Sequence, residues 1–139
     1  MTDLRITAGA FTFLARLERG LAPRTCGRFE AMLPYRERLI HVRWSGEACW
    51  IPLGDRNLGL GPENATSYPA PGEVLLYPGG ISETEILLAY GSVCFASKAG
   101  QLAGNHFLTV VEGGEQLRDL GRLVLWQGAQ DIEFASMRA

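Results

Sequence analysis

Residues 38–53 read RLIHVRWSGEACWIPL, a pattern that is typical of a β-hairpin. Apolar and polar side chains alternate over residues 38–44, Ser45-Gly46 suits a tight turn, and a second strand pattern follows over residues 47–53. Successive side chains of a strand point to opposite faces, so one face of this hairpin is predicted to be buried. The residues predicted to face the core are Ile40, Val42 and Trp44.

Strand patterns recur along the rest of the chain. Alternation, or short apolar runs bounded by turn residues, predicts strands at residues 11–18, 73–77, 84–90, 106–111 and 132–136. Pro78-Gly79-Gly80 predicts a sharp bend between two of these strands. The glycine- and proline-rich residues 54–72 are predicted to form a long, ordered loop, a kind of segment that often carries function.

Two segments have helical spacing instead. Pro23 suits the first position of a helix of about three turns, and Leu33-Pro34 ends that pattern. Residues 113–127 predict a second helix with Gly128 at its end. Gly121 disfavours a continuous helix there, and residues 123–126 also fit a strand.

The composition agrees with a turn-rich β protein. The chain has 139 residues, the usual size of one domain, so we expect a single domain over residues 1–139. Its 17 glycines and 7 prolines exceed the usual share and show no collagen-like period. Many short strands leave exposed edges unless their sheet closes. We therefore expect a mainly β fold, a closed barrel of about eight strands with two short helices.

Charge and cysteine usage exclude several classes of protein. Thirteen basic and fifteen acidic residues give a net charge of -2, which argues against nucleic-acid and membrane-surface binding. No apolar run reaches the length of a membrane helix, and the first residues lack the pattern of a signal peptide. Cys26, Cys49 and Cys94 lie in apolar stretches without a Cys-x-x-Cys spacing. They are predicted to be buried, reduced thiols of a cytoplasmic protein.

One polar constellation is a candidate functional site. Glu63 and Asn64 precede a proline-rich stretch, and Ser82, Glu83 and Glu85 follow the Pro78 bend. If barrel closure brings these segments to one mouth, Glu63 and Glu83 could share a pocket, where like charges raise one pKa and create an acid/base pair. The alternative is structural, with Asn64 in a turn and the glutamates solvated or paired with arginine.

Three further residues complete the predicted ligand-binding set. Tyr68 and Tyr77 flank the same region and combine an apolar ring with a polar tip, although Tyr77 also suits a plain core position. Arg43 could bind a ligand carboxylate through its two-pronged donor, although exposed strand arginines are commonly surface residues. The full predicted set is Arg43, Glu63, Asn64, Tyr68, Tyr77, Ser82, Glu83 and Glu85.

The sequence predicts neither a metal nor a cofactor. His41 and His106 are the only histidines, and no His or Cys pair has chelating spacing. Gly79-Gly80 and Gly113-Gly114 match no phosphate-binding loop.

Residues 63–86, ENATSYPAPGEVLLYPGGISETEI, resemble a bacterial family named domain of unknown function 3830, and residues 121–132, GRLVLWQGAQDI, are similar to it as well. The resemblance covers nearly the whole chain. It implies membership of the cyclophilin-like superfamily of small β-barrels, but no activity. Arg43 and His41, predicted on the non-core face of their strand, lack the aromatic and glutamine-lined surroundings of a cyclophilin groove. Peptidyl-prolyl isomerase activity is therefore not expected.

The leading hypothesis is a small-molecule-binding barrel. Its pocket would lie between residues 54–72 and the bend at residues 78–85, and its ligand would be a small polar or carboxylated metabolite. One alternative is an enzyme with Glu63 or Glu83 as general acid/base. Another is a non-catalytic assembly subunit in which Trp44, Trp50 or the exposed loop meets a second copy or a partner.

Overall fold

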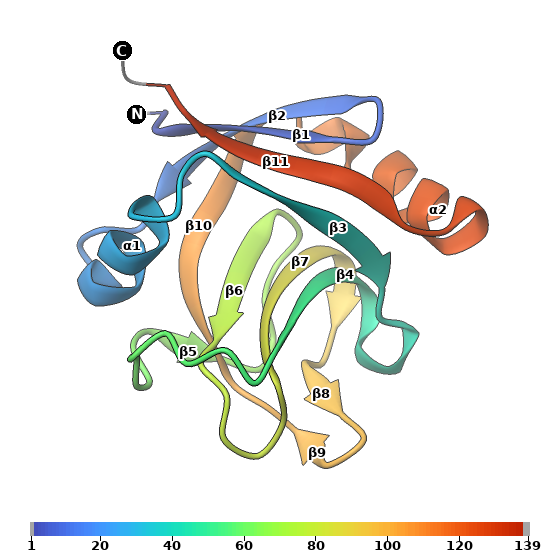
Figure 1. Ribbon diagram of the computed structural model, residues 1–139. Coiled ribbons are helices and arrows are strands. Elements are labelled where there is room, and N and C mark those ends of the chain that lie inside the picture. The colour runs from blue at the N-terminus through green and yellow to red at the C-terminus, as the bar shows by residue number, and fades with distance from the viewer. Residues whose placement is uncertain (1, 138–139) are drawn as a thin grey trace.

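The computed structural model describes residues 2–137. Eleven strands and two α-helices follow one another along these residues (Figure 1). The eight longer strands are β1 (Leu4–Ala8), β2 (Phe11–Leu17), β3 (Tyr35–His41), β4 (Gly46–Gly54), β6 (Glu73–Tyr77), β7 (Thr84–Val93), β10 (Gly104–Glu112) and β11 (Gln130–Ser136). The two-residue strands are β5 (Ala65–Thr66), β8 (Ala96–Ser97) and β9 (Gly100–Gln101), and the α-helices are α1 (Pro23–Glu30) and α2 (Leu117–Gln127).

The eight longer strands close into an antiparallel barrel, as predicted. Their order is β2-β1-β11-β3-β4-β7-β6-β10, and β10 also pairs with β2. Leu108 of β10 lies opposite Leu17 of β2, so the first and last strands of this order meet. Strand β5 adds to β10 outside the ring, and β8 and β9 form a separate small hairpin. The fold is mainly β with two helices.

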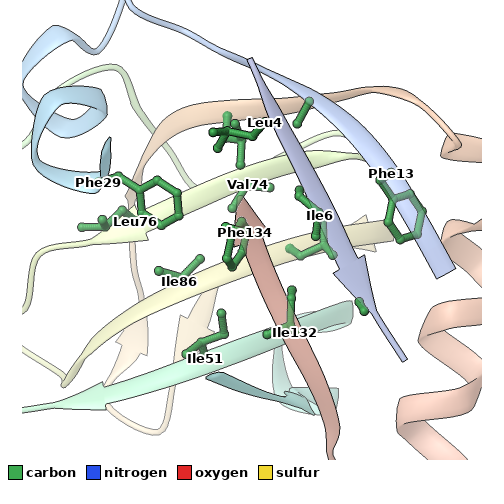
Figure 2. Close-up of a cluster of buried hydrophobic side chains, with 14 of the residues drawn as sticks. Leu4, Ile6, Phe13, Phe29, Ile51, Val74, Leu76, Ile86, Ile132 and Phe134 are labelled. Carbon is green, nitrogen blue, oxygen red and sulfur yellow. The ribbon is translucent and has the colours of Figure 1, made fainter. Parts of the chain in front are cut away.

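The barrel interior is filled by its own side chains. Figure 2 shows apolar residues from several strands converging there, among them Ile6, Val74 and Phe134. The two helices lie on opposite sides of the barrel (Figure 1), and Phe29 of α1 and Val124 of α2 belong to the same buried cluster. The cavity left among the core residues measures only about 10 Å³, room for at most one water molecule. The interior is therefore a packed core and not a ligand site.

A second apolar cluster lies on the outer face of the barrel. It includes Leu75 of β6 and Leu87 of β7, together with Phe95 and Leu102, which flank the β8–β9 hairpin. This segment is anchored by hydrogen bonds from the Phe95 N–H to the Ser67 carbonyl and from the Leu102 N–H to the Phe95 carbonyl. The hairpin thus covers part of the wall formed by β4, β7 and β6. As a result, strand β7 is buried on both faces along most of its length.

The predicted hairpin is confirmed, but the predicted core face of its first strand is wrong. Leu39 belongs to the barrel core, whereas the predicted core residue Ile40 is half-buried and lies in neither buried cluster. Val42 is buried as predicted, but in the outer cluster. His41, predicted on the non-core face, is half-buried and contacts the core residue Tyr90. The alternation fails because a 3₁₀ turn, η1 (Arg43–Ser45), follows the strand. Trp44 lies in that turn and is 57% exposed, so its predicted core position is also wrong.

Both predicted helices are present, but each is shorter than predicted. Helix α1 begins at Pro23 as predicted, but its 8 residues make about two turns instead of three. Helix α2 spans residues 117–127, so the alternative strand at residues 123–126 is wrong. Strand β1 was not predicted. Cys26 and Cys49 are buried as expected, whereas Cys94 is exposed, because it follows β7 where the chain leaves the barrel wall.

Candidate ligand pocket

A pocket of about 650 Å³ lies where the outer wall of the barrel meets two turns. We call it the tryptophan pocket. Its walls come from η1, β4, the start of β7, the bend between β6 and β7, and the turn between β8 and β9. Figure 1 shows the bend and the β8–β9 hairpin side by side at the lower end of the view. The lining residues are Trp44, Trp50, Ile81, Ser82, Glu83, Glu85, Ser97, Lys98 and Ala99.

The apolar walls of the pocket are large side chains that the fold leaves uncovered. Trp44 and Trp50 meet edge to face, with ring centroids 5.6 Å apart and an interplanar angle of 84°. Trp44 is 57% and Ile81 is 74% exposed, although side chains of this kind favour burial. Within residues 2–137, the buried indole Nε1 of Trp50 has no hydrogen-bond acceptor. A flat apolar molecule could cover these surfaces.

Glu85 supplies the more buried of the two carboxyl groups that line the pocket. It lies at the start of β7, opposite Pro52 of β4 and Tyr77 of β6. The residue is only 3% exposed, and no residue in the described part of the chain forms a hydrogen bond or an ion pair with its carboxyl group. Burial first, and then the negative charge of Glu83, raise the pKa of Glu85 from 4.5 to about 8. The unliganded carboxyl group is therefore mostly protonated at pH 7.

The bend that carries Ile81 and Ser82 is held by Tyr77. The Tyr77 hydroxyl accepts hydrogen bonds from the backbone N–H of Ile81, at 3.1 Å, and of Ser82, at 3.4 Å. Its ring packs edge to face against Phe95, at a centroid distance of 5.9 Å. Gly79, at a φ of 94°, allows the sharp turn. Tyr77 was predicted to bind ligand; in the structure it shapes the pocket from behind.

Glu63 has a different role from the one predicted. Its carboxylate accepts hydrogen bonds from the backbone N–H groups of Arg24 and Thr25 and from the Thr25 hydroxyl, at 3.2, 2.8 and 2.8 Å. Burial acts to raise the pKa of Glu63, but these hydrogen bonds outweigh it and leave the pKa lowered. Glu63 lines neither cavity that Glu83 lines. The like-charge pair is Glu83 with Glu85, and the pKa that it raises is that of Glu85.

Three other predicted residues also lie away from the tryptophan pocket. The Asn64 side chain donates a hydrogen bond to the His106 carbonyl at 2.9 Å, and its φ of 51° places it in a turn. Tyr68 is 66% exposed on its loop. Arg43 is exposed in η1. Of the predicted set, the pocket contains Ser82, Glu83 and Glu85.

Sequence reasoning missed Ile81 and Lys98; it predicted a core position for Trp44 and named Trp44 and Trp50 only in the alternative assembly hypothesis. Trp44 and Trp50 lie six residues apart around a turn, a spacing that lets two large rings approach each other on one hairpin. Lys98 lies in a two-residue turn that carried no strand signal. The position where a pocket was expected contains an open groove of about 550 Å³ between residues 54–57 and 78–84. This groove shares Ser82 and Glu83 with the tryptophan pocket.

Within residues 2–137, no group of three or more His, Cys, Asp or Glu side chains is placed to hold a metal ion. No helix in this part of the chain is long and apolar enough to span a membrane.

Comparison with known proteins assigns the family. Residues 4–136 match the model of a family described as a protein of unknown function, DUF3830. The chain belongs to this family. No curated protein matches the DUF3830 chain.

Solved structures share the fold of the DUF3830 chain. McbB, in a structure titled as its complex with tryptophan, matches with a TM-score of 0.76 and 19% identity, over 98% of this chain and 45% of McbB. The DUF3830 chain therefore spans less than half the length of McbB. A solution structure of the hypothetical protein AF2241 from Archaeoglobus fulgidus matches with a TM-score of 0.63 and 16% identity, over 96% of this chain and 93% of AF2241. Identities this low establish the fold alone.

Proposed function

We propose that this DUF3830 chain binds a small metabolite in the tryptophan pocket. The observation that carries the proposal is Glu85, a residue that is 3% exposed and whose carboxyl group opens onto an apolar-walled pocket and has no partner among the described residues. Burying such a group without a hydrogen bond is costly, so natural proteins keep it chiefly where it has a task. The pocket volume of about 650 Å³ is in the range of small-molecule sites.

The ligand has a flat apolar body and a polar or carboxylated end. Trp44, Trp50 and Ile81 supply the apolar surfaces, and Lys98 in the β8–β9 turn supplies a positive charge for a carboxylate. McbB, which shares the fold at 19% identity, is described in complex with tryptophan, a ligand of this chemical kind. Three probes test this class of ligand. Tryptophan carries both an ammonium and a carboxylate group, indole-3-propionate carries only the carboxylate, and tryptamine carries only the ammonium group.

Calorimetric titration of these probes tests the function. At least one should bind the wild-type chain, and a concentration of 100 times Kd should raise the stability by about 2.7 kcal/mol. Trp44→Ala should weaken binding at least 10-fold, because it removes one wall of the pocket. The matched control is Trp126→Ala, which removes a 74% exposed tryptophan on α2. The absence of binding by all three probes, or an equal effect of the two substitutions, would contradict the proposal.

Fewer residues support the enzyme alternative in the structure than in the sequence. Glu63 is occupied by the first turn of α1, so an acid/base mechanism would depend on Glu83 and Glu85. The pKa of about 8 for Glu85 suits proton transfer near neutral pH. Incubation of each bound probe with the chain, followed by mass spectrometry, separates turnover from simple binding.

We also propose a cyclophilin-like barrel and a reducing, cytoplasmic location. The closed eight-strand barrel with two helices supports the first proposal. The three cysteines are free thiols, which supports the second. Neither proposal includes isomerase activity.

A further inference from the structure

The tryptophan pocket contains a carboxyl group that forms no ion pair with a cation of the described residues. Glu85 has no ion pair or hydrogen bond within the described residues, although it is 3% exposed. Glu83 lies close enough to act on it electrostatically and adds a second carboxylate. Lys98 lines the same pocket but forms no ion pair with Glu85. Residues 2–137 therefore supply no cation that pairs with Glu85 when it is ionised.

The aromatic walls favour a cation of a particular kind. Trp44 and Trp50 meet at 84°, so the pocket presents indole surfaces in two orientations. The face of an indole ring attracts organic ammonium groups, and a carboxylate beside it strengthens the attraction. A bare metal ion fits less well, because no set of three acidic, His or Cys ligands occurs in residues 2–137.

We infer that the ligand of the tryptophan pocket carries an organic ammonium group, which the carboxylate of Glu85 binds. The inference rests on the proposed function and makes it specific: the ligand is an apolar amine, or an amino acid whose carboxylate faces Lys98 at the β8–β9 turn. Ser97, the last residue of β8 before this turn, can add a hydrogen bond to that carboxylate.

Binding of the ammonium group is coupled to loss of a proton. In the free protein Glu85 is mostly protonated at pH 7, and ion pairing requires its ionised form. The charged or titratable groups that face Glu85 are Glu83 from the bend, Lys98 from the hairpin and Tyr77 from β6. Strand β4 contributes Trp50 and Pro52, which do not titrate. The apparent affinity should rise about 10-fold per pH unit below pH 8 and level off above it.

The test compares tryptamine with indole-3-propionate by calorimetry from pH 6 to pH 9. Tryptamine should bind more tightly, with the stated pH dependence and a proton release that is about one at pH 6 and falls towards none at pH 9, measured in buffers of different ionisation enthalpy. Glu85→Gln should weaken tryptamine binding at least 10-fold at pH 8 and abolish the pH dependence. Glu112→Gln, which changes an exposed glutamate of β10, is the matched control and should change neither.

The outcomes separate this inference from the proposed function. If indole-3-propionate binds and tryptamine does not, or if Glu85→Gln retains the tryptamine affinity, the ammonium assignment is wrong while a pocket for small molecules remains. If neither probe nor tryptophan binds the wild-type chain, both proposals fail. If Glu85→Gln does not fold, the proton release of the wild-type chain decides the question, because binding without proton release contradicts the role of Glu85.

Discussion

Glu63 accepts hydrogen bonds from both the backbone N–H and the hydroxyl of Thr25, each at 2.8 Å, although the two residues are 38 positions apart. Thr25 lies in the first turn of α1, whose own N-cap residue is Ala22 and provides no side-chain hydrogen bond. The Thr25 hydroxyl also accepts a hydrogen bond from the Asn105 side chain at 3.1 Å. Glu63 therefore caps α1 from the long loop and ties the helix to strand β10.

Glu63→Ala should destabilise the protein without affecting the tryptophan pocket. Loss of a helix cap costs about 0.5–2 kcal/mol, and urea denaturation measures it. Because the pKa of Glu63 is lowered in the folded state, its contribution is present above the ordinary value of 4.5 and is lost as the pH falls through the folded pKa. Unchanged stability, or loss of ligand binding without loss of stability, would contradict the capping role.

Glu85 should make stability fall as the pH rises. Its folded pKa of about 8 exceeds the ordinary value of 4.5, so between these values the native state holds a proton that the unfolded chain has lost. Relative to Glu85→Gln, the wild-type free energy of unfolding should therefore decrease at up to about 1.4 kcal/mol per pH unit from pH 5 to pH 8, and level off above. Denaturant titrations at a series of pH values provide the measurement, and parallel curves for the two proteins would rule out a buried, unpaired Glu85.

Gly121→Ala should destabilise the packing of α2. A Cβ at this position would overlap the ring of Tyr90, which is fixed by a 2.7 Å hydrogen bond to His41. Overpacking of this kind costs about 1–3 kcal/mol. Gly27→Ala is the matched control, since Gly27 also lies in a helix but has no atom within 4 Å of the added Cβ. The control should gain up to about 1 kcal/mol, and thermal denaturation that changes equally in both variants would argue against close contact at Tyr90.

Cys94 should be the only thiol that reacts rapidly in the native state. Cys26 and Cys49 are buried, and burial raises the pKa of Cys26 to about 11 and of Cys49 to about 12. Labelling with a thiol reagent at pH 8 should modify one cysteine before denaturation and all three after it. Cys94→Ser should abolish the rapid reaction. Rapid labelling of a second thiol would show that the barrel opens near Cys26 or Cys49.

The barrel strands could largely be predicted because one face of each faces an apolar core. Strand β6 spans residues 73–77 as predicted, and β2 and β11 follow the alternating pattern closely. The alternation of apolar and polar residues predicted the wrong core face where a strand has apolar neighbours on both faces. At the end of β3 the outer cluster covers Val42, so burial does not mark the inner face there. The exposed position of Trp44 was not predicted, because a 3₁₀ turn interrupts the two-residue alternation of the strand.

The candidate site was predicted only in part. Ser82, Glu83 and Glu85 were selected from local composition, and all three line the tryptophan pocket. Glu63 was joined to them by an assumption about loop convergence, but three donors from the first turn of α1 occupy its carboxylate. Strand propensity cannot reveal that the β8–β9 hairpin folds over the wall beside Glu85. The available signal was a glutamate at the start of the apolar run of residues 86–90.

The tryptophan pocket lies outside the barrel wall, so the residues that line it are separate from those that form the packed interior. The residues at its rim lie in or beside two short turns, residues 81–83 and 97–99, whereas the packed interior comes from the strands and helices. Substitutions in the two turns can therefore change the lining of the proposed site at little cost to the core. A barrel of this design is suited to diversification, and the same two turns are the positions at which new binding specificities could be engineered.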